Sequence, residues 1–318
     1  MLGSPGRSSS FAPSSILARR RDGEAAPGTD DRPPARDLRS TARLAGKAVW
    51  FATNRGTAMA RPLPEFVIVG AQRAGTTSLF RYLCRHPAVL PPLFHKESHF
   101  FDLRYGRGLG WYRAEFPSVL ARRRRRAAIG IEPITGEATP YYLFHPLAPG
   151  RVRACLPHVR VIALLRDPVS RAYSHYRHSV AWGFETLSFE DALRAEPDRL
   201  AGEADRIARD PSYRSFSHQH HSYAERGDYQ PQLEAWLDII PSDRMLILFS
   251  EDLFADPDAT FRRVARFLGI PQRSLDRYER TNVGRSAPMP DAAREILEER
   301  FLEPNRRLRT FLGGPLPW

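Results

Sequence analysis

Short apolar runs separated by longer amphipathic stretches dominate the pattern of this chain. Four runs rich in Val, Ile and Leu predict buried strands, within residues 66–69, 129–135, 159–165 and 245–249. Elsewhere apolar residues recur at helical spacing and predict helices, over residues 146–156, 169–182, 227–240, 256–268 and 291–311. Strands that alternate with helices predict an α/β fold of three layers, in which helices cover both faces of a mainly parallel central sheet.

The first predicted strand leads into a glycine-bounded turn and then a helix. Gly70 and Gly75 bracket the turn, and three hydroxyl residues follow at 76–78. Free N–H groups in a first helical turn, together with the helix dipole, attract anions. The spacing is close to the P-loop G-x-x-x-x-G-K-[ST], but Thr76 stands at the lysine position and the cation, Arg73, lies inside the loop. The pattern favours a P-loop-NTPase-like anion site; an ordinary strand-turn-helix corner is the plainer alternative.

Two further strand ends carry polar residues. Glu137 follows the second predicted strand, and Arg166 follows the third, with Ser174 roughly two turns along the next helix. Because open parallel sheets bind ligands beyond the carboxyl ends of their strands, we expect these residues and the loop to face one crevice. A loop for one anion and an Arg/Ser pair for a second would suit a ligand with two separated anionic groups.

Composition adds a preference for anionic partners. The formal net charge is +12 and the isoelectric point is near 10.2. Only two of the 48 basic residues are lysines, so the arginine run at 122–126 is read as a solvated helix end or loop rather than as a binding patch. Two cysteines make neither a disulfide framework nor a zinc site, and the histidines of the 218–221 region lack ligand companions, so no metal is expected.

The ends of the chain suggest its organisation. Residues 1–60 should form a disordered basic segment with a short amphipathic helix near 41–60, which packs on the domain or makes peripheral membrane contact. Residues 61–318 should form the folded domain, in which the polar stretch 183–222 is an irregular variable insertion or lid. Without a transmembrane run or an apolar signal core, and with an arginine bias typical of a high-GC genome, we expect a cytoplasmic bacterial protein.

Four segments together resemble a known family. They are Gly-Ala-Gln-Arg-Ala-Gly-Thr-Thr-Ser (70–78), Glu-Ala-Thr-Pro-Tyr-Tyr (137–142), Leu-Leu-Arg-Asp-Pro-Val-Ser-Arg-Ala-Tyr-Ser-His-Tyr (164–176) and Phe-Leu-Glu-Pro-Asn-Arg-Arg-Leu (301–308). In order and spacing they resemble the sulfotransferases, in particular the heparan sulfate N- and 3-O-sulfotransferase branch and its bacterial relatives. The resemblance covers about residues 64–312 and implies 3′-phosphoadenosine 5′-phosphosulfate (PAPS) as co-substrate, with no metal.

The resemblance also implies a role for each matching residue. The loop would hold the 5′-phosphosulfate through Arg73, Ala74, Gly75, Thr76, Thr77 and Ser78. Arg166 and Ser174 would hold the 3′-phosphate. A later loop of the family carries Lys-Gly-Arg and closes over the nucleotide; here Gly284 and Arg285 match it, and Val283 stands at the lysine position.

The chemistry of the reaction completes the predicted site. Glu137 matches the family's catalytic base, and a carboxylate beside the anion loop can take the proton of an acceptor hydroxyl; an ion-pair or capping role is the alternative. Arg73 and Lys96 would meet the charge that develops on the sulfonate. Lys96 begins a charged and aromatic cluster, 96–102, that suits a site wall, although pairing with Glu97 is its plainer role. His99 is a further candidate there.

The acceptor is the open part of this prediction. We expect a hydroxyl on a carbohydrate, glycolipid or metabolite, and no nucleic acid; the oligomeric state stays open. Two other functions remain: a P-loop kinase that uses ATP and Mg²⁺, and a non-catalytic polyanion-binding protein that keeps the fold. Dependence on Mg²⁺ would distinguish a kinase from a sulfotransferase. If Glu137→Gln left all measurable behaviour unchanged, that result would indicate the binding protein.

Overall fold

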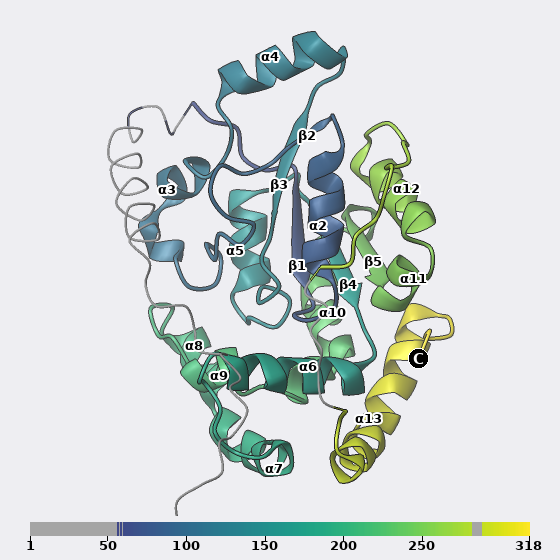
Figure 1. Ribbon diagram of the computed structural model, residues 1–318. Helices are drawn as coiled ribbons and strands as arrows, with labels where there is room; N and C mark the ends of the chain where they lie inside the picture. Colours follow the sequence, from purple (N-terminus) through teal and green to yellow (C-terminus); the bar gives the residue numbers. More distant parts are fainter. Residues whose placement is uncertain (1–55, 57, 59, 282–287) are drawn as a thin grey trace, which may run out of the picture. The chain divides into compact units, whose positions relative to one another are not determined.

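A five-stranded parallel sheet forms the centre of the domain (Figure 1). The structure is a computed structural model, and it describes residues 56, 58, 60–281 and 288–318. The strand order is β2-β3-β1-β4-β5. The strands are β1 (Phe66–Gly70), β2 (Val89–Leu90), β3 (Ile134–Ala138), β4 (Arg160–Leu165) and β5 (Met245–Phe249). This arrangement confirms the predicted α/β fold with a mainly parallel central sheet.

Helices pack on both faces of this sheet. The chain steps from β1 towards β2 through α2, and from β3 to β4 through α5 in the opposite direction, so right-handed crossovers place α2 and α5 on opposite faces. Helix α12 contacts α2 and β5. The α-helices are α2 (Thr76–Arg85), α3 (Leu109–Arg113), α4 (Val119–Ile129), α5 (Ala148–Cys155), α6 (Pro168–Ala181), α7 (Phe189–Leu200), α8 (Glu203–Arg209), α9 (Phe216–His220), α10 (Tyr229–Leu237), α11 (Ser250–Ala255), α12 (Pro257–Leu268) and α13 (Asp291–Leu312).

Strand β1 is buried along its whole length because it lies between β3 and β4. Phe66 pairs with Gly136 of β3, and a Cβ on Gly136 would lie 2.5 Å from the Phe66 ring, so only glycine fits there. Phe66 also packs against Phe80 of α2, with ring centroids 6.4 Å apart. The apolar β1 sequence therefore anchors the sheet and brings the ends of β3, β1 and β4 side by side.

Several predicted elements have other bounds. The run at 129–135 is not one strand: Ile129 ends α4, Gly130 terminates that helix in a left-handed conformation, and β3 starts only at Ile134. The arginine run lies in α4, as a solvated helix. The segment 183–222 is not irregular, since it contains α7, α8 and α9. The last helix is continuous over 22 residues, and the short strand β2 had no distinct sequence signal.

Candidate active site

The turn after β1 leads into an uncapped helix N-terminus, as the sequence predicts. Gly75 is the N-cap of α2 and has a φ of 94°. Among the described residues no side chain caps this end, and the first turn carries no acidic residue. A Cβ on Gly75 would lie 2.9 Å from the ring of Phe254, so the backbone needs glycine both for its conformation and for space. The free donors and the helix dipole make this end attractive to an anion.

Two arginines meet beside this turn. The Nε of Arg73 donates to the Oγ of Ser174 over 3.0 Å, and the Nη1 of Arg166 donates to the backbone oxygen of Arg73 over 3.0 Å. Burial and the charge of Arg166 lower the pKa of Arg73. The adjacency of β1 and β4 thus gathers Arg73, Arg166 and Ser174 at one place, where an anion would relieve the repulsion between the two cations.

A chain of charged residues runs along the segment that follows β2. The Nζ of Lys96 donates to Thr77 and pairs with Glu97, both over 2.8 Å. Glu97 lies 3.3 Å from the Nε2 of His99, whose Nδ1 lies 2.8 Å from Asp102. The Glu97 side chain is 40% exposed, whereas that of Asp102 is fully buried. Lys96 therefore forms the ion pair with Glu97 that was its plainer alternative and also contacts the anion loop, while its approach to a sulfonate stays a prediction.

The electrostatics keep Glu97 and His99 charged at neutral pH. Burial alone would raise the pKa of Glu97, but hydrogen bonds from His99 and Lys96 and their charges lower it to about 2. Burial alone would lower the pKa of His99, but hydrogen bonds to Asp102 and Glu97 raise it to about 9. Glu97 is thus an ionised and partly exposed carboxylate at neutral pH.

Glu137 has a different environment. It lies within β3, in register with Val67, and is 1% exposed. Its carboxylate accepts hydrogen bonds from the backbone N of Ser98 (3.1 Å), Tyr112 (2.6 Å), Thr139 (2.8 Å) and Tyr142 (3.2 Å). Burial raises its pKa. A carboxylate with every side occupied by donors has no room for an acceptor hydroxyl, and this position does not fit the predicted base.

A cleft of about 1160 Å³ joins most of these features. From the anion loop, Arg73, Gly75, Thr76 and Thr77 line it, and Arg166 and Ser174 line it from beyond β4. Lys96, Glu97 and His99 line it as well. Glu137, Ala74 and Ser78 do not; Ala74 is buried, and the Oγ of Ser78 accepts a hydrogen bond from the N of Thr281. Gly284 and Arg285 lie outside the described residues, so their roles stay predictions.

Sequence reasoning did not single out Glu97 as a candidate site residue, although the structure places its carboxylate in the cleft. Its signal was present in the cluster Lys-Glu-Ser-His-Phe-Phe-Asp (96–102), where the charged residues were expected to form a site wall. Glu137 lies in a more recognisable sequence motif than Glu97, yet its position in β3 places its side chain in the core. Exposure to the cleft, which a sequence does not display, separates the two glutamates.

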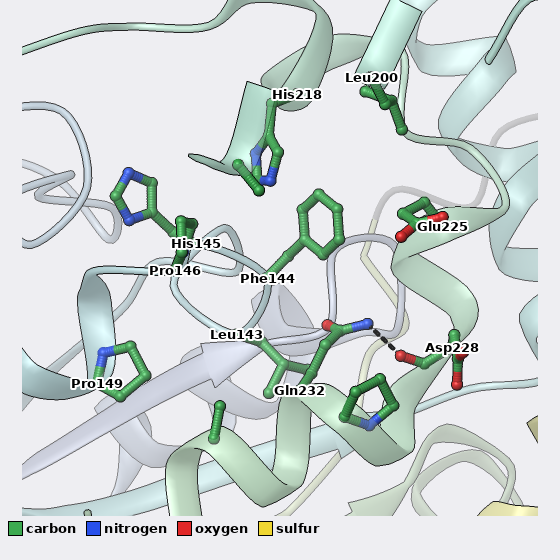
Figure 2. A pocket seen from close by; sticks show the side chains of 13 residues that line it. Leu143, Phe144, His145, Pro146, Pro149, Leu200, His218, Glu225, Asp228 and Gln232 are labelled. Atoms are coloured by element: carbon green, nitrogen blue, oxygen red, sulfur yellow. Dashed lines mark hydrogen bonds between the residues drawn. The ribbon is translucent and has the colours of Figure 1, made fainter. Parts of the chain in front are cut away.

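A second pocket of about 270 Å³ shares no lining residue with the cleft. Figure 2 shows its mainly apolar wall around Phe144 and Leu143, with His145 and His218 on one side and Asp228 and Gln232 on the other. Burial and nearby cations lower the pKa of His218 to about 3. None of the predicted site residues that the structure describes lines this pocket.

Comparison with known proteins places the chain in a family. The sequence pattern of the sulfotransferase domain matches residues 63–286. The chain belongs to the sulfotransferase family. It is 30% identical over 287 residues to mouse heparan sulfate glucosamine 3-O-sulfotransferase 3B1, a match that covers 81% of this chain. The human 3B1 protein is 32% identical over 223 residues, 69% of this chain and 49% of that protein.

A solved bacterial structure shares the fold. The sulfotransferase from Alicyclobacillus acidocaldarius is 30% identical, with a TM-score of 0.59, and the match covers 80% of this chain and 98% of that one. The chain spans 65% of the length of the mouse relative. Within the described residues, no helix has the length and apolar character needed to cross a bilayer. The cellular location of the protein stays a prediction.

Proposed function

We propose that this sulfotransferase uses PAPS as donor and transfers its sulfuryl group to an acceptor hydroxyl, with Glu97 as the base. One observation carries the proposal: the uncapped N-terminus of α2, the cations Arg73 and Lys96, and the exposed carboxylate of Glu97 all line a single cleft. An anionic donor needs the helix N-terminus and the cations, and an attacking hydroxyl needs the carboxylate. Family membership and the names of the relatives support sulfuryl transfer, and these names favour a carbohydrate hydroxyl.

The residues of the cleft fit a donor with anions at two ends. Loop N–H groups, Thr77 and Lys96 would hold the phosphosulfate, and Arg166 with Ser174 would hold the 3′-phosphate. PAPS supplies an activated sulfuryl group that needs no metal to leave its phosphate. Lys96 and Arg73 would neutralise charge on the sulfonate oxygens; fixed donors of this kind are worth roughly a hundredfold or more each in rate.

Glu97 would take the proton of the acceptor as the acceptor oxygen bonds to sulfur. Its resting partners, Lys96 and His99, hold the carboxylate ionised. If Lys96 moves its charge onto the sulfonate, the pKa of Glu97 rises and the carboxylate becomes a better base. His99, fixed by the buried Asp102, would keep Glu97 oriented towards the cleft.

Glu137 would then act as a positioning residue that holds the backbone beside Glu97. Its carboxylate accepts from the N of Ser98, and the N of the next residue in β3, Ala138, donates to the backbone oxygen of Lys96 over 2.9 Å. The end of β3 is thus hydrogen-bonded to the backbone on both sides of Glu97. This contact explains a buried glutamate within the 137–142 motif without a direct role in proton transfer.

Two measurements test the proposed function. Calorimetry should show that the product nucleotide, 3′-phosphoadenosine 5′-phosphate (PAP), binds more tightly than ATP. Transfer of labelled sulfate from PAPS should continue in the presence of EDTA. Tighter binding of ATP, or transfer that requires Mg²⁺, would refute the proposal and favour the kinase alternative.

A further inference from the structure

An aromatic surface continues the cleft beyond Glu97 and reaches solvent. It consists of His178, Trp182, Phe184, Phe216 and His220, which we name the aromatic wall. Neighbouring rings are in contact, with centroids 5.9 Å apart for His178–Trp182, 6.3 Å for Trp182–Phe184, 5.6 Å for Phe184–Phe216 and 4.3 Å for Phe184–His220. All of them except Phe216 line the cleft. The end of α6, the following loop and α9 build the wall.

The wall lies close to the reacting groups of the proposed function. The charges of Arg73 and Glu97 both affect the pKa of His178, and the charge of His99 affects that of His220. These effects place the wall within electrostatic range of the reacting groups. Arg166 and Ser174, which are predicted to hold the 3′-phosphate, line the same cleft.

Much of the wall is exposed apolar surface. Trp182 is 61% exposed and Phe216 is 50% exposed, and the nearby Val180 is 42% exposed. Large aromatic side chains that remain open to water beside a reactive cleft mark a binding surface more often than a packing fault. Their ring faces offer stacking area for a flat partner, at little cost in side-chain entropy.

The wall carries no permanent charge. None of its five residues is Lys or Arg, and burial with nearby cations lowers the pKa of His220 to about 4 and also lowers that of His178. Arg226 lines the cleft nearby, but its guanidinium is buried and donates to Gln72 and to the backbone oxygens of His218 and Gln219. The five residues of the wall therefore offer no permanent cation to an anionic polysaccharide.

We propose that the acceptor is an uncharged hydroxyl compound with an apolar ring system, which stacks on the aromatic wall while its hydroxyl reaches Glu97. The inference rests on the proposed function and adds the substrate class. It separates this chain from the relatives named for heparan sulfate, an anionic polymer. Stacking orients the acceptor, and the absence of charge along the wall disfavours polyanions through uncompensated desolvation.

Steady-state transfer from PAPS tests this inference, with neutral ring compounds such as 2-naphthol and phenyl β-glucoside compared with an N-sulfated heparosan oligosaccharide. We expect turnover of the neutral compounds and little or none of the oligosaccharide. Trp182→Ala should raise the KM of the neutral acceptor about tenfold and leave the KM of PAPS unchanged, because one stacking partner is lost. Trp182→Phe should recover most of that loss.

The matched control is Leu302→Ala, which removes a 70% exposed side chain from α13 and should change neither KM. An unchanged acceptor KM in Trp182→Ala, no turnover of any neutral ring compound, or a preference for the oligosaccharide would overturn the inference. PAP binding by calorimetry shows that each variant is folded and separates the two proposals. If the wild type binds PAP and sulfates only the oligosaccharide, the inference alone fails; if it binds no PAP, the proposed function fails as well.

Discussion

Replacing each glutamate in turn by its isosteric amide tests which one is the base. In Glu97→Gln the side chain keeps its shape and a partly exposed position, but it loses its negative charge and its ability to take a proton. The lost ion pairs with Lys96 and His99, whose side chains are only 17% and 21% exposed, should cost about 1–3 kcal/mol of the free energy of unfolding. Loss of a general base should lower kcat by roughly 10²- to 10⁴-fold.

Glu137→Gln should lose mainly stability and keep more of its turnover than Glu97→Gln. Its buried carboxylate accepts from four donors, and an amide has one oxygen, so the NH₂ group must face one of them. The hydroxyl of Tyr112 can turn to accept, but that of Tyr142 already accepts from the N of Phe100 and the N of Phe101, and the N of Ser98 cannot accept. A buried donor left without a partner costs about 1–3 kcal/mol, and Tm should fall by roughly 2–4 °C for each kcal/mol. Turnover should fall about tenfold or less, through displacement of Glu97.

Three measurements on the same preparations decide between the two glutamates. Transfer of labelled sulfate from PAPS gives kcat, calorimetry gives PAP affinity, and thermal unfolding gives Tm. We expect Glu97→Gln to keep its PAP affinity and to lose turnover, with a fall in Tm no larger than that of Glu137→Gln. The reasoning would be refuted if Glu137→Gln lost a hundredfold or more in turnover at unchanged Tm and PAP affinity, while Glu97→Gln stayed active.

Three further predictions follow from the geometry of the cleft. His99 should stabilise the fold fully below about pH 6.5 and lose this contribution as pH rises through about 9, so the Tm difference between wild type and His99→Gln should shrink from pH 6 to pH 10; a difference that grows would contradict the raised pKa. Gly75→Ala should cost about 1–2 kcal/mol of unfolding free energy and weaken PAP binding, because the residue has φ 94° and no space for a Cβ, whereas Gly106→Ala, with nothing within 4 Å, should do neither. Arg73→Ala should lower kcat/KM for PAPS by roughly a hundredfold or more, and unchanged transfer of labelled sulfate would remove Arg73 from the donor site.

The anion loop is the part of the site that local sequence predicts best. Its strand, glycines, hydroxyl run and helix are consecutive, and each has a conformational preference that agrees with the others. Arg166 and Ser174 could also be placed, because a parallel sheet aligns the ends of its strands. The predicted start of β3 was wrong for a local reason. The apolar run at 129–135 contains the last residue of α4, Ile129, and the left-handed Gly130 that terminates this helix, so the strand begins only after them.

The sequence by itself determined the α/β layers, the anion loop and the family, since these depend on residues that are neighbours along the chain or repeat with a fixed period. Only the tertiary structure decided the orientation of the two glutamates. Strand pairing turns Glu137 towards Ser98 and Tyr112, which are distant in sequence, and leaves Glu97 facing the cleft. It also assembled the aromatic wall from α6 and α9. Burial and exposure depend on contacts between distant segments, and a local pattern does not contain them.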